Sequence, residues 1–255
     1  MLESIGVFLN SVLNPVFSPL LVLPPFFSIL VMSFVISLVV SVIYKYTTDQ
    51  DLMRRLKAEL KELQAEMKLL RSEPEKMMVV QKKAMETNMK YMSHSFKSTL
   101  FTFIPILIIF SWMGAHLAYY PLSPNEEFAV SVLLEDGLGL NASITAPEGI
   151  EVVSDAVQKI NSNSVGWKLK GVEGSYVLSF LIGDKEYEKD ILITKEKKYV
   201  QVEKAVNDGV VKSINSGNAP IKPINLFGWK IGWLGTYIIF SIFSSILLRK
   251  IMKLA

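Results

Sequence analysis

Residues 45–97 read KYTTDQDLMRRLKAELKELQAEMKLLRSEPEKMMVVQKKAMETNMKYMSHSFK, a charged segment that is also rich in methionine. Proline cannot continue a helix and pushes the preceding residue out of the helical region, so Ser72-Glu73-Pro74 predicts a break. Before the break, apolar residues recur at spacings of four, three, four and three, as in the seam of a coiled coil: Leu56, Leu60, Leu63, Met67 and Leu70.

After the break, Met78, Met85 and Met92 fall seven residues apart, and Met89 and Phe96 fill the same seam. Residues 45–99 are therefore predicted to form a helical hairpin packed as a coiled coil. Methionine is also flexible and polarizable, which suits promiscuous binding of apolar segments. Two interpretations stay open for the dense methionines, either as glue between the two helices or as a client-binding surface: Met77, Met78, Met85, Met89 and Met92.

Two apolar runs flank the hairpin, Phe26–Tyr44 and Leu100–Tyr120. About 20 apolar residues in a helix cross the hydrocarbon of a bilayer, so each run predicts a membrane span, at residues 26–44 and 100–120. Residues 226–248 predict a third span, without a charged residue from Gly232 to Leu248 and followed by a basic tail at 249–255. The chain is 50% hydrophobic and 20% charged with mean hydropathy +0.34, as expected when charge is segregated from apolar spans.

Residues 121–225 alternate apolar and polar positions in short runs between turn signals, which predicts a β-sandwich-like domain with about seven strands. The final part, Lys212–Asn225, is rich in Ser, Asn, Gly and Pro and is predicted to be a tether. The predicted fold is thus a polytopic α-helical membrane protein with three transmembrane helices, a helical hairpin and an inserted β domain. The predicted strands are Phe128–Leu134, Ala142–Thr145, Ile150–Val153, Trp167–Leu169, Tyr176–Ile182, Asp190–Ile193 and Tyr199–Val202.

The distribution of basic residues predicts the topology. Residues 45–99 hold 12 Lys and Arg against 8 Asp and Glu, whereas residues 1–25 hold no Lys or Arg. The positive-inside rule places the hairpin and the C-terminus in the cytoplasm and the N-terminus and the β domain outside. Residues 1–25 are predicted to form an interfacial segment, the alternative being a lead into the first span. Asn141-Ala142-Ser143 is a weak glycosylation signal in the outer domain.

Small hydroxyl side chains form rows along the spans. Serines at positions 33, 37 and 41 step down one face of the first span, which fits either close helix packing or a polar cavity lining. A second polar row in the third span brings the two interpretations to equal weight. The cavity interpretation predicts a groove lined by Ser33, Ser37, Ser41, Thr99, Thr102, Ser241, Ser244 and Ser245.

The chain has no cysteine and two histidines, His94 and His116. Cysteine-ligated metal, thiolate chemistry and disulfides are thereby excluded. Ser111 and His116 are five apart on one predicted helix and so lie on different faces, and no carboxylate in a span orients the histidine. The sequence predicts neither a cofactor nor a metal site, and no enzyme activity.

The order of these parts resembles the YidC/Oxa/Alb superfamily of membrane protein insertases, especially its archaeal YidC-like branch. The resemblance covers residues 1–120 and 225–255. One departure is that many bacterial members carry an arginine inside the membrane groove, whereas no span here has Lys or Arg in its core. The segments that carry the resemblance are Leu23-Pro24-Pro25, Thr48-Asp49-Gln50-Asp51-Leu52-Met53-Arg54-Arg55, Ile104-Pro105-Ile106-Leu107 with Trp112, and Gly232-Trp233-Leu234-Gly235-Thr236-Tyr237.

The resemblance implies a membrane protein insertase or chaperone that receives hydrophobic nascent or tail-anchored segments on the hairpin and passes them into the bilayer through the groove. The implied partners are nascent membrane proteins, membrane lipids and further membrane subunits. The basic excess of the hairpin and the basic C-terminal tail fit contact with the ribosome or with anionic headgroups, the alternative being a solvated charged face. The alternative is a membrane-anchored sensor or scaffold, in which the outer β domain binds a ligand and the coiled coil reports inside.

Overall fold

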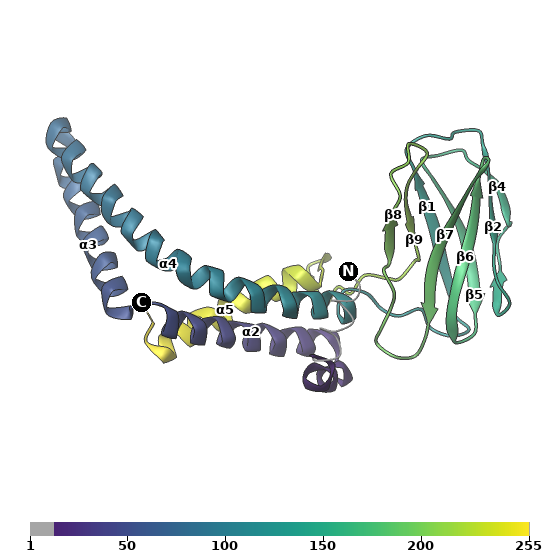
Figure 1. Ribbon diagram of the computed structural model, residues 1–255, viewed down its shortest axis with the longest axis horizontal. Helices are drawn as coiled ribbons and strands as arrows, with labels where there is room; N and C mark the ends of the chain where they lie inside the picture. The colour runs from purple at the N-terminus through teal and green to yellow at the C-terminus, as the bar shows by residue number, and fades with distance from the viewer. Residues whose placement is uncertain (1–12, 255) are drawn as a thin grey trace. The chain divides into compact units, whose positions relative to one another are not determined.

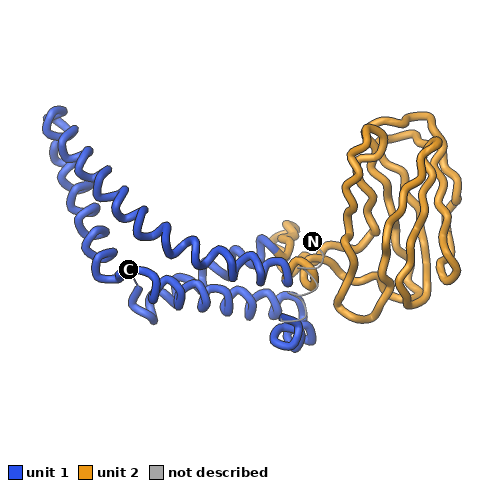
Figure 2. The backbone as a smooth tube through the Cα atoms, viewed as in Figure 1, with its two compact units in different colours: residues 1–112, 234–255 blue, residues 113–233 orange. Residues whose placement is uncertain are grey.

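The computed structural model describes residues 13–254 and divides the chain into two compact units (Figure 2). The first unit comprises residues 1–112 and 234–255, and its described part is helical; the second comprises residues 113–233 and is rich in β-strands. Within residues 13–254, three helices are long and apolar enough to cross a membrane. This combination fits the predicted polytopic membrane protein. An interfacial segment was predicted for residues 1–25; its first 12 residues lie outside the part of the chain that the structure describes.

The first apolar helix, α2 (Pro25–Thr47), begins at a proline. Backbone N–H groups in the first turn of a helix have no acceptor within the helix, and proline suits this position because it has no N–H. Its 23 residues extend about 35 Å at 1.5 Å per residue, enough to cross the hydrocarbon. Residues 13–17 are helical and lead into the 3-10 turn η1 (Ser18–Val22) before it. This leading segment packs on the helix that carries Trp112, whose indole donates to Asn14 Oδ1 at 2.8 Å.

The hairpin begins at α3 (Gln50–Leu69), where Asp49 accepts hydrogen bonds from Asp51 N and Leu52 N at 3.1 and 3.0 Å. Such an N-cap satisfies backbone donors that the first helical turn leaves free. The short turn η2 (Leu70–Ser72) then leads into α4 (Pro74–His116), so the break falls at the predicted proline. Figure 1 shows α3 lying beside the first part of α4.

Of the seam predicted for α3, Leu56 and Leu63 are buried and the other three residues are half-buried, whereas the seam predicted for α4 is wrong. Met53, Leu56 and Leu63 of α3 are buried. In α4 the inward face instead carries Val80 and Thr87, with the Thr87 hydroxyl 3.3 Å from Glu59 of α3. Coiled-coil packing of the two helices stays a prediction. The residues assigned to the seam of α4 are exposed: Met78, Met85, Met89, Met92 and Phe96.

The second arm of the hairpin and the second span are one uninterrupted helix of 43 residues. Pro105 lies inside it, as predicted. The helix ends at His116, so Tyr119 and Tyr120, predicted as the end of the span at residues 100–120, lie beyond it. The third apolar helix, α5 (Trp233–Met252), starts later than the predicted span at residues 226–248.

The β-rich unit contains a five-stranded sheet, in the order β3-β5-β1-β9-β8, and a four-stranded sheet, in the order β4-β2-β6-β7. All pairings between these strands are antiparallel. The bounds are β1 (Glu127–Leu134), β2 (Asn141–Thr145), β3 (Ile150–Val152), β4 (Val157–Lys159), β5 (Ser164–Gly171), β6 (Gly174–Ile182), β7 (Lys185–Ile193), β8 (Glu203–Ala205) and β9 (Val211–Asn215).

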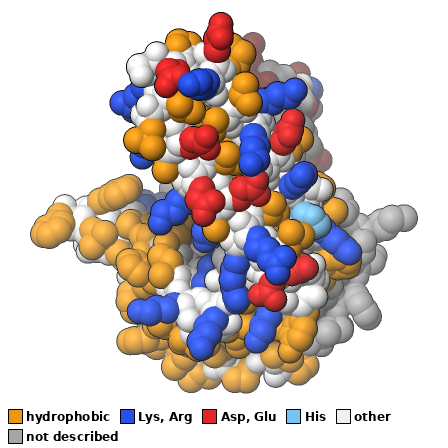
Figure 3. All heavy atoms as spheres, turned by 90° about the vertical axis from the view of Figure 1, so that its left-hand side faces the viewer, with side chains coloured by type: hydrophobic (Ala, Val, Ile, Leu, Met, Phe, Trp, Pro, Cys, Tyr) orange, Lys and Arg blue, Asp and Glu red, His pale blue; other side chains and the backbone are white. Residues whose placement is uncertain are grey.

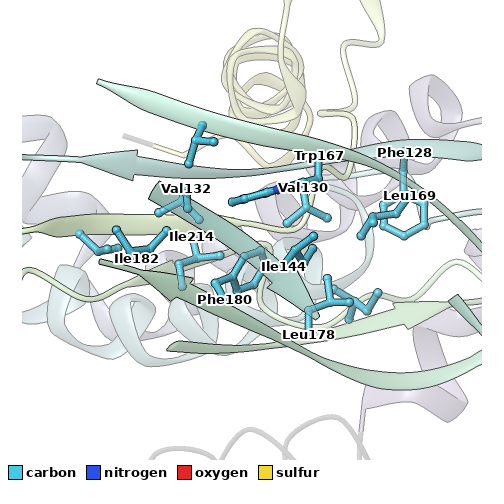
Figure 4. Packing of buried hydrophobic residues seen from close by; sticks show 14 of the residues in the cluster. Phe128, Val130, Val132, Ile144, Trp167, Leu169, Leu178, Phe180, Ile182 and Ile214 are labelled. Carbon is cyan, nitrogen blue, oxygen red and sulfur yellow. The ribbon is translucent and has the colours of Figure 1, made fainter. Parts of the chain in front are cut away.

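The core of this unit lies between the two sheets, where alternate residues of the longer strands meet (Figure 4). Trp167 and Phe180 are fully buried with ring centroids 5.5 Å apart, and the Trp167 indole donates to Ala156 O at 3.1 Å. Alternating burial along β1 and β5 is the pattern of strands that cover a core with one face. The predicted β-sandwich architecture is therefore present.

Several predicted boundaries in this unit differ from the structure. The segment predicted as a tether, Lys212–Asn225, contributes most of β9, which pairs with both β1 and β8. Residues 199–202 were predicted as a strand, but β8 begins at Glu203. A separate hairpin of β10 (Ile224–Leu226) and β11 (Trp229–Ile231) occupies residues predicted as the start of the third span.

Candidate functional site

A polar pocket of about 210 Å³ lies where the three apolar helices meet the base of the hairpin. Its walls come from the last turns of α2, from residues 91–102 of α4, and from the last turns of α5. Hydroxyl side chains supply much of its surface: Ser41, Ser95, Ser98, Thr99, Thr102 and Ser245. Tyr44 and Tyr91 add two phenols, and Arg249 adds a cation.

The three helices that form the pocket contact one another through specific side chains. Phe110 of α4 packs edge-on against Tyr237 of α5 with ring centroids 4.6 Å apart. Phe26 of α2 packs against Phe240 of α5 at 5.2 Å. Between α2 and α4, the Thr47 hydroxyl lies 2.9 Å from Ser98 Oγ. The pocket is thus one feature of a packed three-helix bundle.

Two of the pocket hydroxyls, those of Thr99 and Thr102, are oriented by hydrogen bonds to their own helix. Thr99 donates to Ser95 O at 3.1 Å, and Thr102 donates to Thr99 O at 2.9 Å. A hydroxyl that donates to the preceding turn of its own helix keeps its oxygen lone pairs as acceptors. The pocket therefore offers oriented oxygen acceptors to a polar group that enters it.

Arg249 places a positive charge at the rim of the pocket. Its guanidinium carbon lies 5.3 Å from the centre of the Tyr44 ring, within the range of a cation–π contact. The C-terminal residues fold back beside it, with Leu254 N donating to Arg249 O at 3.0 Å and Leu254 lining the pocket. Arg54 of α3 donates to Lys253 O at 2.8 Å and so fixes this tail to the hairpin.

The structure brings four of the eight predicted groove residues to the pocket: Ser41, Thr99, Thr102 and Ser245. Ser33 and Ser37 are buried against α5 instead, with their hydroxyls 3.5 Å from Tyr237 O and 3.4 Å from Ser241 O. Here the small side chains let two helices approach closely, as in the packing interpretation. Ser241 donates to Ile238 O at 2.9 Å within α5, and Ser244 is buried; neither lines the pocket.

The serine row of α2 divides because an i, i+4 row drifts around its helix. Each step of four residues turns about 40° beyond a full turn, since a helix has 3.6 residues per turn. Ser33 and Ser37 therefore point at α5, whereas Ser41, two steps beyond Ser33, lines the pocket.

Seven residues that line the pocket are absent from the groove lining that the sequence predicts: Val40, Tyr44, Tyr91, Ser95, Ser98, Arg249 and Leu254. Arg249 follows Ser241 and Ser245 at successive steps of four, so the helical period contained a signal for it. Tyr91 and Ser95 lie in the part of α4 that was assigned to the hairpin, and no signal in the sequence linked them to the spans.

The hairpin presents the four exposed methionines of α4 and Phe96 on one face. The methionine side chains are between 57% and 68% exposed, whereas Met77 is half-buried toward α3. At 100° per residue, positions 78, 85, 89, 92 and 96 lie within an arc of about 60°. We call these five residues the methionine stripe. Figure 3, which faces the hairpin end of the molecule, shows hydrophobic side chains between charged ones of both signs.

The methionine stripe continues along the same helix into the apolar span. Leu100, Phe103 and Leu107 are more than half exposed and extend the arc to about 80°. From Met85 to Leu107 the apolar face covers 22 steps, or roughly 33 Å of helix, whereas the exposed Lys82 lies within the arc between Met78 and Met85. A continuous apolar surface thus joins Met85, in the hairpin, to the membrane-spanning part of α4.

The β-rich unit holds a polar cluster of its own, away from the features above in the sequence. Asp208 accepts hydrogen bonds from the Tyr187 hydroxyl at 2.7 Å and from Lys185 Nζ at 3.0 Å. Burial, followed by the hydrogen bond to Asp208, raises the pKa of Tyr187 to about 12. Within residues 13–254 no group of three His, Asp or Glu side chains is arranged to hold a metal ion.

Comparison with protein families supports the membrane assignment. Residues 10–133 match the family model described as integral membrane protein EMC3/TMCO1-like. That family is related to the insertase superfamily that includes Oxa1, YidC and EMC3. The match covers α2, the hairpin, α4 and most of β1, and it does not single out the YidC-like branch. Comparison with curated proteins and with solved structures found no match.

Proposed function

We propose that this membrane protein inserts hydrophobic segments of other proteins into the lipid bilayer. The methionine stripe would receive the apolar part of a client, and the polar pocket would lower the barrier for the polar residues that accompany it. The similarity of residues 10–133 to an insertase-related family supports this role. The observation that carries it is the hydroxyl-lined pocket at the point where an exposed apolar helix face enters the bundle.

The energetic problem for an insertase is the polar part of its client. An Asp, Lys or Arg at the centre of a membrane helix costs about 2.5–3.5 kcal/mol on insertion scales, and unpaired backbone groups cost several kcal/mol each. Oriented hydroxyl oxygens in the pocket would partner backbone N–H groups of the client while they are between water and lipid. Such a pocket lowers the barrier without ATP or a covalent intermediate.

The charge of Arg249 would make the pocket favour clients with acidic residues over clients with basic residues. A cation at the rim attracts acidic residues of a client and repels basic ones. Arg249 is exposed, so the effect is limited to about 1 kcal/mol by solvent screening. Arg249 would thus replace the groove arginine that the spans lack in their cores.

The remaining parts of the proposal follow from charge. The excess of 12 basic over 8 acidic residues in the 45–99 segment favours a cytoplasmic hairpin, with the N-terminus and the β domain outside. The same basic excess and the tail residues Arg249, Lys250 and Lys253 would contact ribosomal RNA or anionic headgroups. Further membrane subunits would cover exposed faces of the three helices. Within the insertase superfamily, the sequence motifs favour the archaeal YidC-like branch.

Photocrosslinking to ribosome-bound nascent membrane proteins tests the proposal. A photoreactive residue at Met85, Met89 or Ser245 should crosslink to the apolar segment of the nascent chain. Matched controls are Glu86 and Lys90, which are exposed on the same helix but lie about 100° around it from the methionine stripe. Equal crosslinking from the controls, or none from the stripe, would reject the stripe as the client surface.

A reconstituted insertion assay separates the pocket from the stripe. Replacing Ser41, Thr102 and Ser245 together with alanine, valine and alanine should slow insertion of clients that carry charged translocated residues, while wholly apolar clients insert as before. The control is Ser33→Ala with Ser37→Ala, because these serines pack against α5 outside the pocket. If both sets of variants insert charged clients at the original rate, the pocket has no role in insertion.

A further inference from the structure

The β10–β11 hairpin ends in apolar side chains that the rest of its unit leaves uncovered. Phe227 is fully exposed, Trp229 is 73% exposed and Leu226 is 48% exposed. The two strands have three residues each and form a sheet of their own. An isolated two-stranded hairpin is marginally stable in water, so a surface that covers these rings would stabilise it.

The turn of this hairpin places a large aromatic residue where the backbone disfavours one. Phe227 has φ +51° and Gly228 has φ +92°, the two left-handed positions of a two-residue turn. Asparagine or aspartate is favoured at the first of these positions, and a bulky residue there is strained. The turn is closed by Gly228 N, which donates to Asn225 Oδ1 at 3.0 Å. Phenylalanine therefore serves something other than turn formation.

The position of the hairpin in the chain determines what lies within its reach. β11 ends at Ile231, and the apolar helix α5 begins two residues later at Trp233. Three residues of strand extend about 10 Å, so the tip stays close to the end of a membrane span. The headgroup region on each side of the hydrocarbon is roughly 5–7 Å thick, which is within that reach.

We propose that the tip of this hairpin, Leu226-Phe227-Gly228-Trp229, inserts into the headgroup region of the bilayer beside α5. Aromatic side chains favour this region, because it accommodates an apolar ring together with the polar N–H of an indole. Lys222 and Lys230 flank the tip and would meet lipid phosphates. The hairpin thus acts as an anchor on the lipid surface, independently of any insertion activity.

Spin labelling in proteoliposomes tests this directly, because the chain contains no cysteine. Nitroxide labels are attached at Phe227→Cys and, as a matched control, at Leu138→Cys, an exposed apolar residue in the β1–β2 loop. The label at 227 should collide more often with oxygen than with a water-soluble nickel complex, and the label at 138 should show the reverse. A label at 227 as accessible to nickel as the one at 138 would overturn the proposal.

A second variant tests whether the ring itself is the anchor. Phe227→Asn suits the left-handed turn and so keeps the hairpin folded. In a Trp229→Cys background, this substitution should raise the nickel accessibility of the label at 229 severalfold. An unchanged accessibility would overturn Phe227 as the anchor. A label at 227 that is immobile and shielded from both agents would instead indicate contact with protein, such as a second copy, and would also overturn the proposal.

Discussion

Tyr199 secures the chain that follows α4 through three hydrogen bonds at one oxygen. Its hydroxyl donates to Gly114 O at 2.6 Å and accepts from Ala118 N at 3.0 Å and Tyr119 N at 3.3 Å. Tyr199→Phe removes the oxygen and leaves these backbone groups short of partners, so we expect a loss of about 1–3 kcal/mol. Hydrogen exchange at residues 117–120 should accelerate accordingly.

The control for this substitution is Tyr176→Phe. Its hydroxyl makes a single exposed hydrogen bond to Val172 O at 3.2 Å, so its removal should leave exchange almost unchanged. Equal acceleration in both variants would mean that the hydroxyl of Tyr199 holds nothing in place.

The Asp208 cluster predicts a pH dependence of the β-rich unit in both directions. Hydrogen bonds from Tyr187, Val211 and Lys185 hold the pKa of Asp208 below its ordinary 3.8, so its contribution to stability is lost as the pH falls below 3.8. The pKa of Tyr187 is raised from 10.0 to about 12, so the folded state keeps a proton that the unfolded state loses. Stability should therefore also fall as the pH rises from 10 to 12.

Asp208→Asn and Tyr187→Phe test the acid and alkaline limbs of this pH profile, which are coupled by the hydrogen bond between the two side chains. The first should remove the acid dependence that Asp208 causes, and the second should remove the alkaline dependence that Tyr187 causes. The measurement is the midpoint temperature of thermal unfolding of the β-rich unit, determined as a function of pH. If stability still falls at both low and high pH in both variants, other titrating groups cause the pH dependence.

At the scale of the helical elements, α4 carries two apolar faces with different expected roles. Leu63 of α3 is buried at 4% exposure and packs toward the inward face of α4, whereas Met85 is 65% exposed on the methionine stripe. Leu63→Ala should destabilise the hairpin by about 2–4 kcal/mol, because it leaves a cavity. Met85→Ser should change hairpin stability by less than about 0.5 kcal/mol.

Hydrogen exchange of α3 measures both variants on the same scale. Exchange should rise in Leu63→Ala and stay constant in Met85→Ser, while client crosslinking should be impaired by Met85→Ser. A hairpin that loses equal stability in both variants would show that the methionine stripe is packed against protein.

The apolar rows of α3 and α4 differ in how well their spacing predicts which residues are buried. In α3 charged residues surround one apolar row, and the spacing predicted two of its buried residues, Leu56 and Leu63. In α4 two apolar rows run side by side, and the regular heptad of methionines is the exposed one. Periodicity detects an apolar face but not what covers it, so the buried row at Val80 and Thr87 was missed.

At the scale of the whole molecule, composition predicted the parts better than their boundaries. Hydropathy located all three apolar helices, and alternation located most strands of the sandwich. The Ser, Asn and Gly residues around β9 predict a tether, yet β9 lies between β1 and β8 in the sheet. Gly217, just after it, has φ +83° and lies so close to Ala129 that a side chain would collide with the backbone. That close approach is a tertiary contact, which local composition does not encode.

The division into two units predicts that the pocket survives without the sandwich. Every residue that lines the pocket belongs to the helical unit. The chain enters and leaves the sandwich side by side, since Tyr119 bridges Pro220 and Tyr120 N donates to Ala219 O at 2.9 Å. A short glycine linker in place of residues 123–217 should therefore close the gap without strain.

The shortened chain should keep the pocket and its insertion activity, whereas a sensor whose ligand site lies in the β domain would lose its response. Insertion of charged and apolar clients is compared in proteoliposomes, with a label at Ser245→Cys reporting on the pocket. The deletion also removes Tyr199, so Tyr199→Phe in the full chain is the matched control for the loss of its hydrogen bonds. If that substitution inserts normally and the deletion does not, the sandwich itself takes part in insertion and the helical unit is insufficient.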